Sequence, residues 1–169
     1  PRCPSRPTTR SAPQSTESSV VTSLAALWTW DALVAACAAV TDGSPASEIT
    51  GFSIDTRALQ PGEIFVALKD VRDGHDFVTQ AFANGAAGAL VSTSYARKSG
   101  DGPLLRVADP LRALEDIGRA ARARLSPSAK VIALTGSAGK TGTKEMLRAC
   151  LSPYGATHAP EKSYNNHWG

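Results

Sequence analysis

The chain has 169 residues, of which 42% are hydrophobic and 20% are charged, a balance that indicates one ordinary globular domain or slightly more. The formal net charge is only +3, and residues 1–23 carry much of it. A nearly neutral body argues against nucleic-acid binding, which needs a concentrated basic face. No apolar run approaches the roughly 18 residues of a membrane span, so we expect no membrane insertion.

The cysteines and the chain ends add two further expectations. Cys3, Cys37 and Cys150 are an odd number without the spacing of a zinc site, so they favour neither a disulfide framework nor a metal centre and fit a reducing cytoplasm. The chain starts at Pro1, and its single methionine is the internal Met146. We therefore expect a fragment of a longer protein, cut at both ends.

Residues 1–23 are rich in Ser, Thr, Pro and Arg and have almost no large apolar side chains. Such a segment cannot bury enough surface to offset the entropy of ordering, so a disordered leader is expected. It lacks the apolar core of a secretory signal. A transit peptide is the alternative, because the segment is rich in Arg and Ser.

Strand and helix patterns alternate along the rest of the chain, which is typical of an α/β fold. Thr29 can cap a helix whose apolar spacing runs to Val40 and which Gly43 ends. Asp109 followed by Pro110 is another strong helix start. The other predicted elements are strands over 49–54, 64–68, 89–91, 104–107 and 131–134, and helices over 76–84 and 141–151.

The segment from Val131 to Thr141 carries the clearest chemical signal. An apolar strand runs into T-G-S-A-G-K-T and then into a helix, and the glycines let backbone N–H groups wrap around a phosphate. The helix N-terminus and the Lys140 ammonium add positive charge, and the Thr141 hydroxyl is the expected Mg2+ ligand. Leu134 departs from the general P-loop, which has glycine there. A chance Gly-Lys-Thr is the alternative, against which the flanking strand and helix argue.

Several segments together resemble the Mur ligases, the ATP-dependent amino-acid-adding enzymes of peptidoglycan synthesis. They are the phosphate loop, S-I-D-T-R at 53–57, P-G-E-I-F-V-A-L at 61–68, D-G-H-D-F at 73–77 and K-S-Y-N-N-H-W-G at 162–169. Within the family they are most similar to the member that joins D-alanyl-D-alanine to UDP-N-acetylmuramoyl-tripeptide. The resemblance covers about residues 27–169.

The resemblance implies how the chain is organised. A small N-terminal α/β nucleotide-sugar domain is expected over 24–108, after the leader over 1–23. The first β-α-β portion of a P-loop central domain is expected over 109–169. The remaining metal ligand, the modified lysine and the adenine pocket of the family would lie beyond this sequence, so the chain by itself is expected to be inactive.

The resemblance also implies two sets of site residues. The UDP-muramoyl peptide would contact Ser53, Ile54, Asp55, Thr56, Arg57, Asp70, Val71 and Arg72. ATP would contact Thr135, Gly136, Ser137, Ala138, Gly139, Lys140, Thr141, Asn165 and Asn166, with Lys140 and Thr141 as the catalytic residues and Thr141 on Mg2+. An ordinary asparagine-rich turn remains the alternative for the asparagine pair.

Three residue types have a competing structural explanation. Arg57 is favoured as an anion ligand because its planar guanidinium matches phosphate. For Asp55, a structural role as ion-pair partner or turn cap explains the residue as well as substrate contact does. His75 is more readily a residue that orders its turn than a general base, because no partner constellation surrounds it in the sequence. The arginines of the helix after Pro110 fit a solvated face better than a nucleic-acid stripe, since no aromatics interleave with them.

The implied activity is a cytoplasmic ligase reaction. ATP would convert the carboxylate of UDP-N-acetylmuramoyl-tripeptide to an acyl phosphate, and the amine of D-alanyl-D-alanine would then displace phosphate. Lys140 and magnesium would neutralise the charge that develops. Two alternatives remain open: the family member that adds diaminopimelate or lysine as the third residue, and a non-catalytic nucleotide-binding module.

Overall fold

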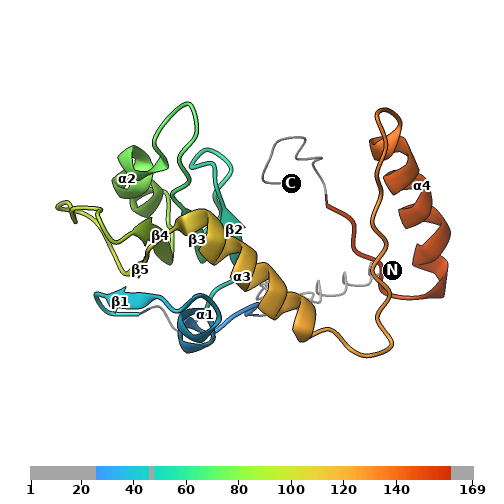
Figure 1. The fold of residues 1–169 in the computed structure, drawn as a ribbon, viewed down its shortest axis with the longest axis horizontal. Coiled ribbons are helices and arrows are strands. Elements are labelled where there is room, and N and C mark those ends of the chain that lie inside the picture. The colour runs from blue at the N-terminus through green and yellow to red at the C-terminus, as the bar shows by residue number, and fades with distance from the viewer. Residues whose placement is uncertain (1–25, 46–47, 161–169) are drawn as a thin grey trace, which may run out of the picture.

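The computed structural model describes residues 26–45 and 48–160 and contains a five-stranded mixed sheet (Figure 1). The strand order is β1-β5-β4-β3-β2, with β2 to β5 parallel and β1 antiparallel to β5. The strands are β1 Val40–Asp42, β2 Gly51–Ser53, β3 Glu63–Val66, β4 Gly88–Ser92 and β5 Leu104–Val107. The predicted α/β class is confirmed. The leader over 1–23 and the pair Asn165 and Asn166 lie outside the described residues.

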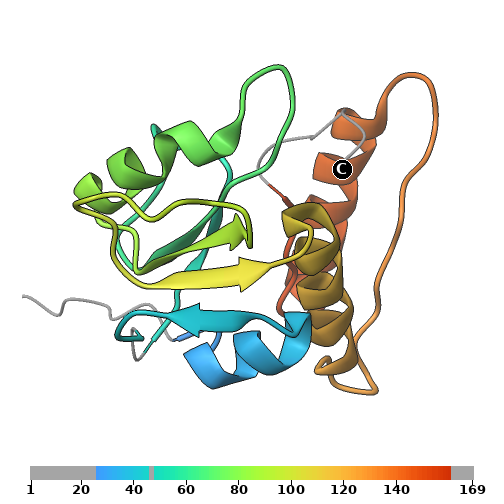
Figure 2. The ribbon, with the colours of Figure 1, turned by 60° about the vertical axis from the view of Figure 1, so that its left-hand side comes forward.

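Helices cover both faces of this sheet (Figure 2). These helices are α1 Trp30–Cys37 and α3 Pro110–Ala123 on one face and α2 Val78–Ala83 on the other. The helix α4 Lys140–Leu151 has no buried residue and does not cover the sheet, and the 3-10 turns are η1 Gly74–Phe77 and η2 Ser152–Tyr154. Successive side chains of a strand point to opposite faces, so β3 places Ile64 in the core under α1 and α3 and Phe65 in the core under α2. The predicted strand over 64–68 is therefore confirmed as a strand buried on both faces, but it spans Glu63–Val66, and the buried Ala67 and Leu68 follow it.

The first helix is shorter than predicted, and the remainder is a strand. Thr29 caps α1 as expected, but the helix ends at Cys37 because Ala38 takes the left-handed conformation, with φ 49°. Val40 then begins β1 and is 64% exposed. The prediction of a helix running to Gly43 is therefore wrong. Three residues of edge strand are too few for their periodicity to differ visibly from the end of a helix.

Two arginines fix β1 to the rest of the sheet. Arg106 Nε donates to the Asp42 carboxylate at 2.9 Å, and Arg97 Nη1 donates to it at 2.6 Å. The hydrogen bond from Arg106 is the largest cause of a lowered pKa for Asp42; desolvation opposes it and Arg97 reinforces it. Trp30 Nε1 also donates to the Thr41 hydroxyl at 2.9 Å, and this hydrogen bond joins α1 to β1.

The helix α3 packs in the same core as α1. Asp109 caps it by accepting from two backbone N–H groups, as predicted, and Ala113 and Ile117 are buried against the sheet. At its C-terminal end the Arg124 guanidinium lies 3.6 Å from the centre of the Trp28 ring. The first helix of the part expected over 109–169 thus packs in the core beside the sheet.

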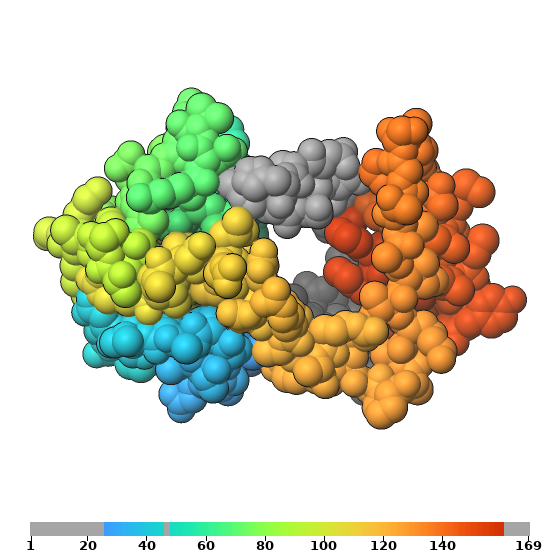
Figure 3. All heavy atoms as spheres, viewed as in Figure 1, coloured from blue at the N-terminus to red at the C-terminus, as the bar shows by residue number. Residues whose placement is uncertain are grey.

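The part that follows α3 carries the phosphate loop and α4 (Figure 3). The predicted helix over 141–151 is confirmed, beginning one residue earlier at Lys140. The predicted strand over 131–134 is wrong for the described residues. Val131 and Ile132 are 57% and 53% exposed and have no neighbouring strand among residues 26–45 and 48–160. A strand is defined by hydrogen bonds to a partner, so an isolated apolar segment does not form one.

Candidate functional site

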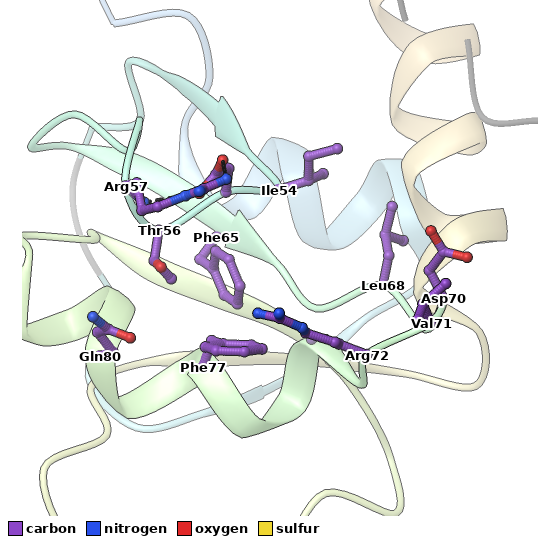
Figure 4. Close-up of a pocket in the computed structure, with 12 residues that line it drawn as sticks. Ile54, Thr56, Arg57, Phe65, Leu68, Asp70, Val71, Arg72, Phe77 and Gln80 are labelled. Carbon is purple, nitrogen blue, oxygen red and sulfur yellow. Dashed lines mark hydrogen bonds and ion pairs between the residues drawn. The ribbon is translucent and has the colours of Figure 1, made fainter. Parts of the chain in front are cut away.

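A pocket of about 650 Å³ opens where β2 and β3 end, and Figure 4 shows its lining. The carboxyl ends of parallel strands are the usual place for a ligand in an open α/β sheet. The pocket brings together the two segments that the resemblance implies for substrate binding, 54–57 and 70–72. Its lining residues are Ile54, Asp55, Thr56, Arg57, Phe65, Leu68, Asp70, Val71, Arg72, Gly74, Phe77 and Gln80.

The first of these segments is a tight turn held by its own side chains. The Ser53 hydroxyl donates to the Asp55 carbonyl at 3.0 Å and accepts from the Asp55 N–H at 3.3 Å. Ser53 is therefore placed beneath the turn and is not among the lining residues. Thr56 is buried, and its carbonyl accepts from the Asn84 side-chain amide at 2.8 Å, which ties the turn to the end of α2.

An ion pair occupies the surface of this turn. Arg57 Nε donates to Asp55 Oδ1 at 2.9 Å and Arg57 Nη2 donates to Oδ2 at 2.7 Å. The Arg57 backbone N–H also donates to Asp55 Oδ1, at 3.0 Å. The hydrogen bond to Asp55 raises the pKa of Arg57 above its usual value. Asp55 thus acts as both ion-pair partner and turn cap, which was one of its two sequence interpretations.

The second segment is a loop between β3 and η1. Gly74 N–H donates to the Leu68 carbonyl at 2.8 Å, and Asp70 N–H donates to the Arg72 carbonyl at 3.1 Å. A side chain at Gly74 would place its Cβ 2.6 Å from the Leu68 carbonyl oxygen, so this closure requires glycine. Val71 is 96% exposed at the tip, whereas Arg72 points back into the pocket (Figure 4).

His75 anchors the loop to β4 rather than facing a reacting group. Its ring is buried, Nδ1 lies 2.6 Å from Asp73 Oδ1, and Nε2 accepts from the Ser92 N–H at 2.9 Å. Burial tends to raise the pKa of Asp73, but hydrogen bonds from the His75 backbone and ring outweigh it and lower the pKa. The prediction that His75 orders its turn is confirmed.

Sequence reasoning did not identify the floor of the pocket. Phe65 and Phe77 form apolar walls, and Gln80 reaches the pocket from α2. Phe65 and Phe77 were noted only as letters of motifs. The sequence could have identified Phe65, because side chains alternate between the two faces of a strand. Phe65 therefore lies on the face opposite to Ile64 and Val66.

The phosphate loop has the backbone shape of an anion cradle. Gly136 and Gly139 have φ values of 145° and 77°, and Gly139 is the residue just before α4. Lys140 begins α4 and its ammonium donates to the Gly136 carbonyl, so the charge lies over the loop. Thr141 lies in the first turn of α4, where backbone N–H groups lack helical acceptors. This donor set fits a phosphate group.

Two curated relatives match this chain over more than two thirds of its length. The chain is 38% identical over 122 residues to the UDP-N-acetylmuramoyl-tripeptide--D-alanyl-D-alanine ligase of Bacillus subtilis and 47% identical over 116 residues to that of Escherichia coli. The matches cover 72% and 68% of this chain but only 26% and 25% of the relatives. A UDP-N-acetylmuramoyl-L-alanyl-D-glutamate--2,6-diaminopimelate ligase of Syntrophomonas wolfei is 35% identical over 68% of this chain and 23% of its own length.

A solved structure agrees with these matches. Crystal structure I of MurF from Acinetobacter baumannii superposes with a TM-score of 0.62 at 39% identity, covering 75% of this chain and 28% of that one. No protein-family model matches the chain. The sheet, with four parallel strands and a pocket at the carboxyl ends of two of them, defines an α/β protein. On its relatives, the chain belongs to the Mur ligase family, and it spans about a quarter of the length of the curated relatives.

Proposed function

We propose that the pocket at the ends of β2 and β3 binds the nucleotide portion of UDP-N-acetylmuramoyl-tripeptide. The observation that carries the proposal is the convergence of residues 54–57 and 70–72 on one pocket. Its volume of about 650 Å³ suits a ligand of nucleotide size, and its walls combine apolar side chains with a few polar groups. The names of two relatives contain this nucleotide sugar peptide.

The second part of the proposal concerns the phosphate loop. Residues 135–141 would hold the phosphates of ATP, with Thr141 on Mg2+ and Asn165 and Asn166 nearby. ATP would supply a phosphoryl group that activates the substrate carboxylate for attack by D-alanyl-D-alanine. Lys140 would orient the phosphates and neutralise charge, which is a positioning role for a fixed cation. A full-length enzyme carrying this chain would be a cytoplasmic ligase of peptidoglycan precursor synthesis. Among residues 26–45 and 48–160, no helix is long and apolar enough to cross a bilayer.

The second candidate is the ligase that adds the third residue of the peptide. It is favoured by the 35% identity to the diaminopimelate ligase of Syntrophomonas wolfei. In that case the substrate would be the muramoyl dipeptide nucleotide. The two candidates share the pocket and the phosphate loop, so they are separated by the length of the peptide that a full-length enzyme extends. A non-catalytic nucleotide-binding module would bind the nucleotides without turnover.

Calorimetric titration with UDP-N-acetylmuramoyl-tripeptide tests the pocket. Ile54 lines the pocket and is 38% exposed, so Ile54→Asp would add a negative charge to the lining with little effect on folding, and that charge would repel an anionic ligand. We expect at least about a tenfold loss of affinity. Val40→Asp is the matched control, because Val40 is an exposed apolar residue on β1 and not a lining residue. Equal affinity for the Ile54→Asp variant and the unaltered chain would refute the proposal.

Turnover of a full-length enzyme tests the phosphate loop. Lys140→Ala should lower kcat by about 100-fold or more, as removal of other preorganised charges does. Binding of the muramoyl nucleotide should change little, because Lys140 lies in α4 and outside the pocket. Lys144→Ala, one turn further along α4, is the control. An unchanged kcat for Lys140→Ala would remove this lysine from the reaction.

A further inference from the structure

The pocket holds two arginines whose guanidinium groups are differently engaged. The Arg57 guanidinium donates two hydrogen bonds to the Asp55 carboxylate, at 2.9 Å and 2.7 Å. Within residues 26–45 and 48–160, the Arg72 guanidinium has no hydrogen-bond or ion-pair partner. We infer that Arg72, and not Arg57, binds the anionic part of the ligand, a diphosphate if the proposed function holds, on which this inference rests.

The direction of the Arg72 side chain supports this assignment. Figure 4 shows it extending from the loop toward the space between Phe65 and Phe77. Phe65 is only 1% exposed, so this wall of the pocket is apolar and keeps water from one side of the guanidinium. A charge beside a low-dielectric wall attracts an anion more strongly than the same charge at an open surface.

The other acidic side chain of the pocket does not cancel this charge. Asp70 lies two residues away on the same loop, but no ion pair joins it to Arg72. Figure 4 shows the Asp70 carboxylate at the rim, on the side of Leu68 and Val71. Among the described residues that line the pocket, Arg72 is therefore the cation that points into the pocket and has no carboxylate partner.

The backbone that carries Arg72 is held on both sides. Its carbonyl accepts from Asp70 N–H at 3.1 Å, and the Lys69 ammonium lies 3.4 Å from the carboxylate of Asp73, the next residue. His75 then attaches the loop to β4. Only the side chain of Arg72 has to be ordered by a ligand, which reduces the entropic cost of binding.

Arg57 is a poor candidate for the same task. To bind an anion it would have to leave the Asp55 carboxylate, and that carboxylate would then face the anion across the pocket. The pair instead fixes the shape of the turn at 53–57. Removing Arg57 should therefore weaken every ligand that contacts this turn, whatever its charge.

Comparison of a charged with a neutral ligand separates the two roles. The 169-residue chain is titrated calorimetrically with UDP and with uridine. Arg72→Gln should lower the affinity for UDP by at least about tenfold and that for uridine by less than about twofold. Arg57→Gln should change both affinities by a similar factor. Arg72→Lys should fall between the unaltered chain and Arg72→Gln, because an ammonium keeps the charge but not the fork.

Each result decides a different statement. An Arg72→Gln variant that binds UDP as the unaltered chain does, or that loses UDP and uridine equally, overturns the assignment of Arg72 and leaves the proposed pocket intact. A selective loss of UDP in Arg57→Gln would give the role to Arg57 instead. An unaltered chain that binds neither UDP nor UDP-N-acetylmuramoyl-tripeptide would overturn the proposed function and the inference with it.

Discussion

Replacing His75 should reveal how unequal the two hydrogen bonds of its ring are. Nε2 accepts from the Ser92 N–H at 2.9 Å, so the proton of the neutral ring is on Nδ1, 2.6 Å from Asp73 Oδ1. His75→Gln can keep an acceptor near the Nε2 position, and His75→Asn can keep a donor near the Nδ1 position. The two variants therefore each retain one bond and lose the other.

The environments of the two partners set the magnitude. Without His75 Nε2, the part-buried Ser92 N–H loses its acceptor, which costs about 1–3 kcal/mol. The Asp73 side chain is 39% exposed and also accepts from the His75 backbone N–H, so loss of the ring bond should cost under about 1 kcal/mol. Both variants lose ring packing against Tyr95, whose centroid lies 5.6 Å away. We expect His75→Asn to be less stable than His75→Gln by about 1 kcal/mol.

Urea unfolding followed by circular dichroism measures this difference, and exchange of the Ser92 amide proton locates it. That proton should exchange faster in His75→Asn than in His75→Gln. Equal stability of the two variants, or greater stability of His75→Asn, would show that the Ser92 bond does not dominate. It would also refute the interpretation of His75 as the anchor between the pocket loop and β4.

Three further predictions follow from contacts of the fold. Gly74→Ala should strongly destabilise the protein in urea unfolding, because the new Cβ would lie 2.6 Å from a backbone oxygen. As the control, Gly118→Ala in α3 would meet no atom within 4 Å and should stabilise the protein by about 0.5–1 kcal/mol. Arg124→Ala should cost about 0.5–1 kcal/mol in the same assay through loss of the stack on Trp28, and an unchanged midpoint would contradict this. The lowered pKa of Asp42 means that its stabilisation is present above the pKa of the unfolded chain and is lost as pH falls through the folded pKa. Asp42→Asn should accordingly flatten the acid side of a plot of urea midpoint against pH.

Local signals in the sequence predicted the elements that depend on neighbouring residues. Asp109 and Pro110 start α3 because a cap and a fixed φ act within one turn. Thr29 caps α1 for the same reason. The predicted strand over 104–107 agrees with β5 residue for residue, since its apolar run is bounded by loops on both sides.

Features that depend on distant partners were not predictable in this way. Val131 begins an apolar run with a strand pattern, yet a strand also needs a neighbour that these residues do not have in the described part of the chain. The pocket itself was predicted as two segments from a family resemblance, but its walls at Phe77 and Gln80 come from tertiary packing. Likewise, the sequence does not show that Arg57 forms an ion pair with Asp55 whereas Arg72 forms none with a described residue, because this difference depends on the three-dimensional positions of the carboxylates.

The two outermost strands of the sheet have a consequence for how the protein behaves among other proteins. β1 and β2 are each three residues long, and sheets with short edges offer little template for pairing with a foreign strand. Asp42 places a charge at the end of one edge, and the bridge between Trp28 and Ile49 occupies the chain just before the other. We therefore expect the edges of the sheet, among the described residues, to pair poorly with strands of other proteins.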